Sequence, residues 1–143
     1  MYERVIRMPK NPAQYIRQER RVCVKLGNGL YRGIRTVPAP LASSRVQDTE
    51  DRLRLIRTAH VGNRGWADIG YHYAIDRAGR VWACRPVTWQ GAHVKDRNEG
   101  NIGILVLGNF EKERPSSAQL SALAMHLKSL SVAYRVPVSR IYT

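Results

Sequence analysis

A glycine-punctuated stretch at residues 65–76, Gly-Trp-Ala-Asp-Ile-Gly-Tyr-His-Tyr-Ala-Ile-Asp, is the feature that most constrains how this chain folds. Gly65 and Gly70 permit tight turns, because glycine adopts backbone angles that other residues avoid. The aromatic and branched residues 71–75 favour a β-strand, and residues 80–84 are typical of a return strand after a turn. The stretch therefore predicts a loop that leads into a β-hairpin.

The first strand of this hairpin carries the first candidate site residues. Because side chains alternate along a strand, Tyr71, Tyr73 and Ile75 are expected on one face, and His72 and Ala74 on the other. A tyrosine and a histidine at the start of a strand, just after a glycine loop, can line a binding site. Aromatic residues in strands are also common core residues, so the pattern alone leaves both interpretations open.

Four other segments have strand character. Residues 21–26 alternate, and residues 30–37 could form a second strand after the Gly-Asn-Gly turn. Residues 101–108 are almost continuously apolar, which predicts a central strand that is covered on both faces. Residues 140–143 have the pattern of a strand that is just beginning.

A helix is predicted to follow Asp48 or Thr49, either of which can cap its amino end. Gly62 is a suitable stop. Residues at helical spacing form the expected inner stripe of this helix: Leu53, Ile56, Ala59 and His60. A histidine at the end of such a stripe is more often a packing residue than a chemical one.

A second helix is the best-specified element of the chain. Ser116 and Gln119 have the spacing of a capping box. His126 lies off the apolar stripe and is expected to face solvent. The stripe that should pack inward has helical spacing: Leu120, Leu123, Ala124, Leu127, Leu130 and Tyr134.

Composition narrows the possible partners. The net charge of +13 predicts attraction to polyanions, whether nucleic acid, anionic lipid or an acidic wall polymer, although an arginine-rich soluble surface explains it equally well. No basic helix face with interleaved aromatic residues supports specific nucleic-acid recognition. No apolar run predicts a membrane span, and no signal peptide is visible, so the sequence leaves the compartment open. Cys23 and Cys84 are too few for a disulfide framework or a cysteine-rich zinc site.

Several motifs, in order and spacing, resemble those of one family. They are residues 64–73 and 76–81, Gly91-Ala92-His93 with Asn98, residues 101–104 and 108–110, and Pro115-Ser116 with Gln119-Leu120. Together they resemble the type 2 N-acetylmuramoyl-L-alanine amidases and the peptidoglycan recognition proteins, over residues 48–143. The resemblance implies a single α/β domain with a mixed central sheet flanked by helices. It also implies muramyl peptides as partners, and one zinc ion in active members.

The resemblance assigns roles to five side chains. Tyr71 matches the family's active-site tyrosine, which helps to stabilise the developing oxyanion beside a zinc-bound water. His60 and Trp66 precede it, and His93 and Asn98 follow it, at positions where the family binds its sugar-peptide ligand. These five residues are the expected substrate-binding residues, with Tyr71 also catalytic.

The zinc ligands of the family are missing from the sequence. A catalytic zinc needs about three protein ligands and an open water position. The family takes one histidine from its first strand, which is expected at residues 29–37 and holds none here, and the other ligands would follow Thr143. We therefore expect no metal ligands in this chain. Asp96 stands where the family often has glycine, and aspartate tolerates left-handed backbone better than most residues.

Residues 1–47 are basic, contain four of the seven prolines and do not match the family. This segment could come from a shifted reading frame, and the whole chain could be a fragment truncated after Thr143. We expect a monomeric, truncated or degenerate amidase domain at residues 48–143. The alternatives are a recognition module without catalysis, a nonspecific polyanion binder, or a chain that does not fold stably.

Overall fold

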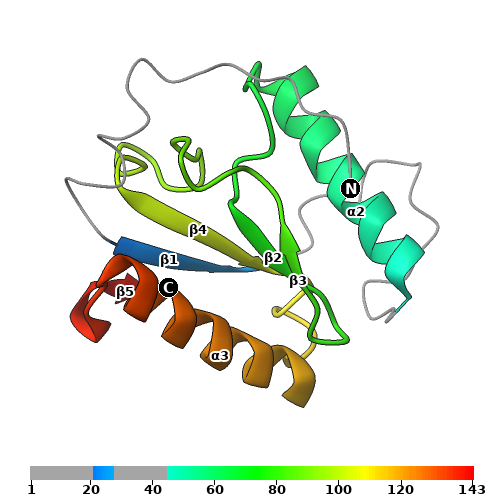
Figure 1. Cartoon of the computed structure of the whole chain (residues 1–143). Coiled ribbons are helices and arrows are strands. Elements are labelled where there is room, and N and C mark those ends of the chain that lie inside the picture. Colours follow the sequence, from blue (N-terminus) through cyan, green and yellow to red (C-terminus); the bar gives the residue numbers. More distant parts are fainter. Residues whose placement is uncertain (1–20, 28–44) are drawn as a thin grey trace.

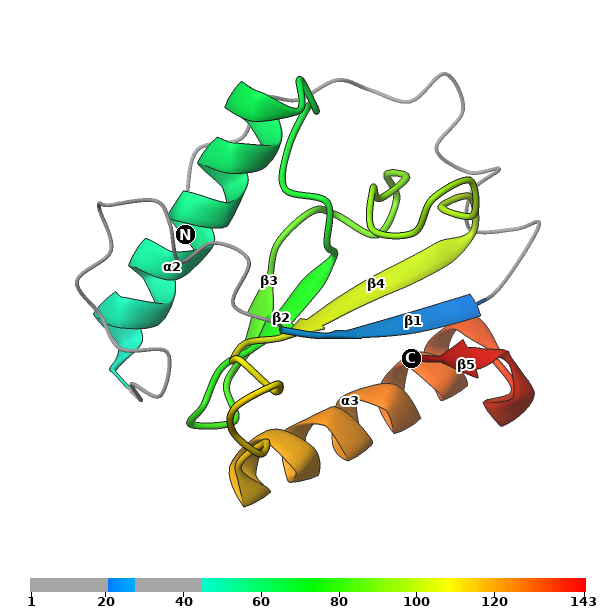
Figure 2. The same ribbon diagram turned by 180° about the vertical axis from the view of Figure 1, so that it is seen from behind.

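One five-stranded sheet organises the protein. The structure, a computed structural model, describes residues 21–27 and 45–143. The strand order is β3-β2-β4-β1-β5, and the sheet lies between the two long helices, α2 and α3 (Figures 1 and 2). The bounds of the elements are β1 Arg21–Leu26, α2 Val46–Thr58, β2 Tyr73–Ile75, β3 Val81–Ala83, β4 Asn101–Val106, α3 Ser117–Tyr134 and β5 Ile141–Tyr142.

The sheet is mixed, as expected. Strands β1 and β2 pair with β4 in parallel, β5 pairs with β1 in parallel, and only β3 is antiparallel to its neighbour, β2. All six residues of β4 are buried, which confirms the prediction of a central strand covered on both faces. The strand that pairs with β4 and β5 is β1, at residues 21–26. The other proposed early strand, at residues 30–37, lies outside the described residues.

Each helix covers one face of the sheet with its own apolar cluster. On the α3 side, Val22, Ile75 and Ile104 pack with Leu130 of the helix. On the α2 side, Leu53 and Ile56 of the helix pack with Ala74, Cys84 and Leu105. A mixed sheet flanked by helices confirms the expected α/β fold. None of the helices in the described part of the chain is long and apolar enough to span a membrane.

Helix α3 begins as predicted, and Leu123, Leu127, Leu130 and Tyr134 of the predicted stripe pack against the sheet. The capping box is present, with the Ser116 hydroxyl accepting a hydrogen bond from the Gln119 amide and the Gln119 side chain accepting one from the Ser116 amide. Leu120 is 53% exposed and Ala124 is exposed, so placing both on the inner stripe was wrong. His126, predicted to face solvent, instead meets the Tyr73 ring edge-on at 4.3 Å between ring centres.

The predicted ends of α2 also differ from the observed ones. The helix begins at Val46 with Arg45 as N-cap, and no side chain caps it. Thr49 is instead buried within the first turns, and its hydroxyl bonds to Asp76. Gly62 does not stop the helix, because a π-helical segment, Ala59–Asn63, continues past it.

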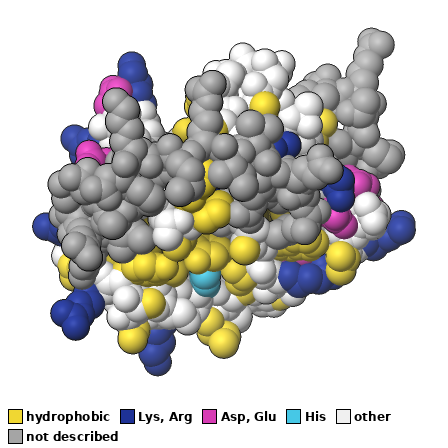
Figure 3. All heavy atoms as spheres, turned by 45° about the horizontal axis from the view of Figure 1, so that its top comes forward, with side chains coloured by type: hydrophobic (Ala, Val, Ile, Leu, Met, Phe, Trp, Pro, Cys, Tyr) yellow, Lys and Arg dark blue, Asp and Glu magenta, His cyan; other side chains and the backbone are white. Residues whose placement is uncertain are grey.

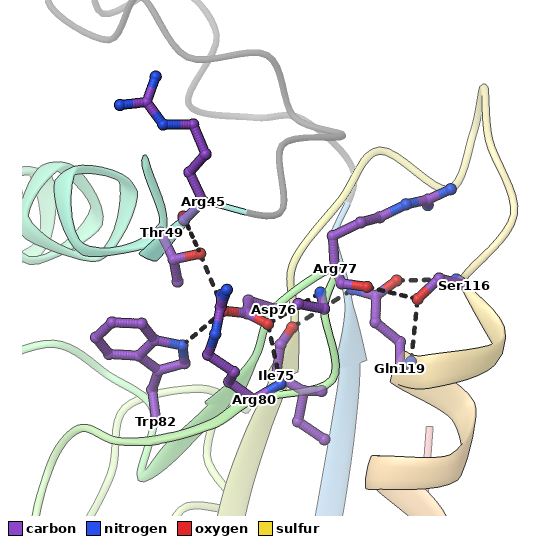
Figure 4. Close-up of polar contacts among 10 residues, drawn as sticks. Arg45, Thr49, Ile75, Asp76, Arg77, Arg80, Trp82, Ser116 and Gln119 are labelled. Carbon is purple, nitrogen blue, oxygen red and sulfur yellow. Dashed lines mark hydrogen bonds and ion pairs between the residues drawn. The ribbon is translucent and has the colours of Figure 1, made fainter. Parts of the chain in front are cut away.

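The buried carboxylate of Asp76 joins α2 to the β2–β3 hairpin. Its Oδ2 accepts hydrogen bonds from the Thr49 hydroxyl at 3.1 Å, the Trp82 indole at 3.0 Å and the Arg80 guanidinium at 2.8 Å. Figure 4 shows these groups converging on the one side chain. Its Oδ1 accepts from the amides of Ala78 and Arg80 and so fixes the turn.

These bonds keep the Asp76 carboxylate charged. Burial by itself raises the pKa of Asp76, but hydrogen bonds from Trp82 and Arg80 and the Arg80 charge outweigh burial and lower the pKa below its ordinary value. On the α3 side, the Gln119 amide donates to the carbonyl of Leu107, just after β4, and thereby ties α3 to that end of the sheet.

We expect the substitution Asp76→Asn to destabilise the protein by about 2–4 kcal/mol. It removes the ion pair with Arg80 and replaces one acceptor oxygen by a donor among buried donors. Urea unfolding followed by circular dichroism measures this. Glu111→Gln, at an exposed position, is the matched control and should change the free energy of unfolding by less than about 0.5 kcal/mol. Equal effects of the two variants would contradict the role given to Asp76.

Candidate functional site

Four aromatic side chains from three segments form a continuous row, here called the ring row. The ring centres are 4.6 Å apart for Trp66 and His60, 5.9 Å for His60 and Tyr71, and 6.4 Å for Tyr71 and His93. The Tyr71 and His93 rings are stacked, with 24° between their planes. His72 meets the His93 ring edge-on at 5.8 Å. The row therefore brings together four of the five side chains that the sequence proposed for substrate binding.

Tyr71 joins this row because it does not follow the alternation of the strand. Tyr73 and Ile75 belong to the α3-side cluster, whereas Tyr71 packs against the α2-side cluster. The chain bends at His72, whose amide donates to the Gly103 carbonyl of β4 at 2.9 Å. The prediction that Tyr71 shares a face with Tyr73 was therefore wrong, and β2 begins only at Tyr73.

Backbone hydrogen bonds fix the imidazoles of the site. His60 Nδ1 accepts from the Gly70 amide at 3.0 Å, and His72 Nδ1 accepts from the Gly103 amide at 3.0 Å. His72 Nε2 then donates to the Trp89 carbonyl at 2.7 Å, and His93 Nε2 lies 3.0 Å from the Asn101 carbonyl. The His60 and His72 rings must therefore be neutral, because each accepts a hydrogen bond with the lone pair of its Nδ1.

Three glycines give the imidazoles their space. A Cβ at Gly103 would lie 2.3 Å from the His93 ring, and one at Gly91 would lie 2.9 Å from His72. A Cβ at Gly70 would lie 2.2 Å from the Ala92 carbonyl oxygen. The His93 loop can approach β4 at Gly103, and the loops at Gly70 and Gly91 can approach each other, only because these positions have no side chain.

Asn98 lies in the loop that carries His93 and is not part of the ring row. Its Oδ1 accepts hydrogen bonds from the amides of His93 and Val94, both at 2.8 Å. It therefore shapes the loop that carries His93. Asp96, in the same loop, has a φ of 59°, which confirms that the chain takes a left-handed conformation there.

Arg85 was missed by the sequence analysis. It is 8% exposed, and its guanidinium donates to the carbonyl of Asp68 at 2.9 Å and to that of Gln90. Arg85 thus joins the loop before Tyr71 to the loop before His93. The Asp68 carboxylate in turn pairs with Arg57 of α2 at 2.9 Å. The only sequence signal was a lone arginine directly after the return strand.

Burial and nearby cations lower the pKa of the three site histidines. The pKa falls to about 4 for each of His60, His72 and His93, and burial is the largest cause. The Arg85 charge lowers all three pKa values further, with Arg64 acting on His60 and Lys25 on His93. The ring row is therefore uncharged at neutral pH.

The side chains at the site do not fit a catalytic zinc. All four histidines and both cysteines lie in the described residues, where no three His, Cys, Asp or Glu side chains gather as a metal site would require. Beside the row, β1 presents Cys23 opposite Gly103 and Lys25 opposite Leu105, and no histidine. A catalytic zinc needs about three protein ligands.

Similarity to known proteins identifies the family of this chain. The family model described as N-acetylmuramoyl-L-alanine amidase matches residues 40–143, most of the chain. The chain belongs to this family. The match includes every residue of the ring row and both long helices.

Individual relatives agree with this assignment. An N-acetylmuramoyl-L-alanine amidase of Sus scrofa is 35% identical over 56% of the chain, and an endolysin of Klebsiella phage KP32 is 38% identical over 57%. The matches span 13% and 57% of the length of these two relatives. The fold resembles that of peptidoglycan recognition proteins LCa and LCx, solved with tracheal cytotoxin bound. The TM-score is 0.74 and the identity 22%, over 99% of this chain and 76% of that one.

We expect acid to destabilise the protein as the three imidazoles become charged. Their pKa of about 4 in the folded state lies below the value of 6.5 expected when unfolded. The contribution to stability is therefore complete above about pH 6.5 and is lost as the pH falls toward 4. Melting temperatures measured from pH 7.5 to pH 4 should decline through this window. A flat profile there would contradict the neutral, buried state of these rings.

We expect Gly103→Ala to displace His93 and to cost about 1–3 kcal/mol, because the new methyl group would overlap the imidazole. Gly62→Ala is the matched control, since a Cβ at Gly62 meets nothing within 4 Å. The control should be neutral or stabilising by up to about 1 kcal/mol. Thermal unfolding and the imidazole NMR signals of the two variants test this, and an unmoved His93 signal in Gly103→Ala would contradict the packing.

Proposed function

We propose that this chain binds N-acetylmuramoyl peptides of peptidoglycan through the ring row. The observation that carries the proposal is the alignment of Trp66, His60, Tyr71 and His93 at ring distances of 4.6–6.4 Å in a member of the amidase family. Aromatic faces and edges suit the apolar faces of sugar rings, and phenol and imidazole groups can hydrogen bond to hydroxyl and amide groups. The likeness to recognition proteins solved with tracheal cytotoxin supports the same ligand class.

We further propose that the chain as given does not hydrolyse the amide bond with zinc. Family members activate water with the metal, which brings the pKa of bound water toward 7. The described side chains supply too few ligands for that metal. Tyr71 can still stabilise negative charge on an oxygen, but a phenol alone leaves water un-ionised at neutral pH. Binding without turnover is therefore the function that these residues support best.

Nonspecific binding of polyanions is the second candidate, because the net charge is +13. The Lys and Arg side chains that are visible in Figure 3 lie at separate places around the margin of that face. Such dispersed charge gives binding that weakens steeply with salt. Muropeptide binding on a largely uncharged ring row should depend much less on salt.

We expect Tyr71→Ala to weaken binding to insoluble peptidoglycan at least about tenfold, since a central aromatic contact is lost. Tyr142→Ala is the matched control, because Tyr142 lies on β5 and is 48% exposed. Pull-downs at low and at raised salt measure both variants.

The same protein should release no stem peptide from purified muropeptides, with or without added zinc. Release that a chelator abolishes would overturn the second proposal and leave the first intact. Binding that vanishes at raised salt and ignores Tyr71→Ala would instead favour the polyanion candidate.

A further inference from the structure

The outer face of helix α3 is apolar although it is exposed. Met125 and Val132 lie seven residues apart, so both project from the same side of the helix, where they are 72% and 75% exposed. Leu120 and Ala124 are also exposed and extend this surface toward the amino end. A helix that covers a sheet usually turns polar and charged side chains to solvent. The outer face of α3 therefore has the composition of a contact surface.

The two long helices differ sharply in charge. Helix α2 carries three acidic and three basic side chains in 13 residues, whereas α3 carries only Lys128 in 18. Lys128 lies three residues after Met125 and so belongs to the same exposed side. The name α3 surface is used here for five exposed residues: Leu120, Ala124, Met125, Lys128 and Val132.

Cations and a further apolar side chain adjoin the carboxyl end of the α3 surface. Arg135 caps the helix, and the short helix η2, Val138–Arg140, follows it closely (Figures 1 and 2). Val138 is 81% exposed, and both arginines are exposed. Residues 116–143 contain three basic side chains and no Asp or Glu. This part of the molecule therefore combines exposed apolar groups with positive charge alone.

We propose that the α3 surface docks on an anionic lipid bilayer, with the helix lying along the membrane. The apolar side chains enter the boundary between headgroups and acyl chains, and Lys128, Arg135 and Arg140 pair with lipid phosphates. The long stem of Lys128 lets its ammonium reach the headgroups while the neighbouring apolar groups insert. Charge complementarity carries this choice of partner, because the surface offers apolar contact and cations together.

A second copy of the chain suits this surface less well. Each copy has a net charge of +13, and two copies that met through α3 would bring their Lys128 charges into the same interface. Like charges placed together in an interface oppose association. An anionic bilayer instead gains from the same charges.

The proposed membrane contact is independent of muropeptide binding. Helices α2 and α3 cover opposite faces of the sheet (Figures 1 and 2), and Tyr71 of the ring row packs on the α2 side. A bilayer against the outer face of α3 therefore leaves the ring row open. Both contacts can form at once, and either can fail without the other.

Vesicle sedimentation tests the choice of lipid. The chain should bind vesicles of equal parts phosphatidylglycerol and phosphatidylcholine at least about tenfold more tightly than vesicles of phosphatidylcholine alone. Met125→Ser combined with Val132→Ser should weaken binding to the mixed vesicles about tenfold, because the inserted apolar groups are lost. Val46→Ser combined with Val81→Ser is the matched control, since these valines are exposed on α2 and β3. The control should bind as the unmodified chain does.

A charge-matched pair tests the cation on the α3 surface. Lys128→Gln should weaken binding to the mixed vesicles about fivefold. Lys95→Gln removes one exposed positive charge in the loop that carries His93 and should have a much smaller effect. Equal losses in the two variants would indicate attraction by net charge and overturn the proposal.

A fluorescence measurement locates the contact directly. Met125→Trp places an indole on the α3 surface, and Val46→Trp places one on α2. Vesicles with brominated acyl chains should quench the added fluorescence of Met125→Trp and leave that of Val46→Trp unchanged. Equal quenching would overturn the proposal. This result also decides the matter if the double serine variant unfolds.

Two further outcomes would overturn the inference while leaving muropeptide binding untouched. One is failure of the unmodified chain to bind the mixed vesicles. The other is a dimer that forms without lipid and dissociates in the variant Met125→Ser with Val132→Ser, as measured by sedimentation equilibrium. The dimer would assign the α3 surface to a second copy. Pull-downs on peptidoglycan with Tyr71→Ala test the proposed function separately.

Discussion

The contact between the His93 ring and the bare backbone of β4 at Gly103 is the constraint on which the site depends. Any side chain at Gly103 would occupy the volume of the imidazole. With the ring in that place, its Nε2 reaches the Asn101 carbonyl and its face meets Tyr71. Tyr71 stacks on the His93 ring and in turn lies beside His60. The positions of both residues therefore depend on how closely the His93 loop approaches β4. The absence of a side chain at Gly103 in the central strand β4 thus determines the geometry of the whole row.

Charge neutrality is the second condition for this arrangement. Three imidazoles lie around Arg85, a buried cation, and they can do so only in the uncharged form. The neutral form is also what the backbone needs, because His60 and His72 accept amide hydrogen bonds that a protonated nitrogen could not accept. Arg85 and the imidazoles therefore support each other: the guanidinium ties the two loops together, and its charge disfavours protonation of the rings that hold those loops in place.

Much of the fold could be predicted from sequence, because hydrophobic periodicity and capping and turn residues determine the helices and strands locally. The strand at residues 21–26, the buried strand at 101–106 and the capping box of α3 are confirmed. The errors arose where tertiary contacts outweighed local pattern. Leu120 is exposed in α3 because the buried polar Gln119 takes the inner position, where it bonds to the Leu107 carbonyl.

The site itself was only partly predictable. Family motifs identified Trp66, His60, Tyr71 and His93, which lie together, but not the face of Tyr71, because the bend at His72 depends on a hydrogen bond to a distant strand. The hydrogen-bond partners of Asn98 and Arg85 could not be predicted from sequence either. Each acts through backbone groups, Asn98 on the amides of its own loop and Arg85 on two carbonyls, and no spacing rule reveals such partners.

The ring row and the Asp76 carboxylate lie at opposite ends of the strands β2 and β4. Tyr71 and His72 precede β2, and His93 bonds to the first residue of β4, whereas Asp76 follows the last residue of β2. The anchoring network in Figure 4 thus shares no side chain with the row. Substitutions that change contacts in the ring row can therefore leave the Asp76 network at the other end of the strands unchanged. The spatial separation of the two sets of residues means that the framework and the ring row can be altered independently.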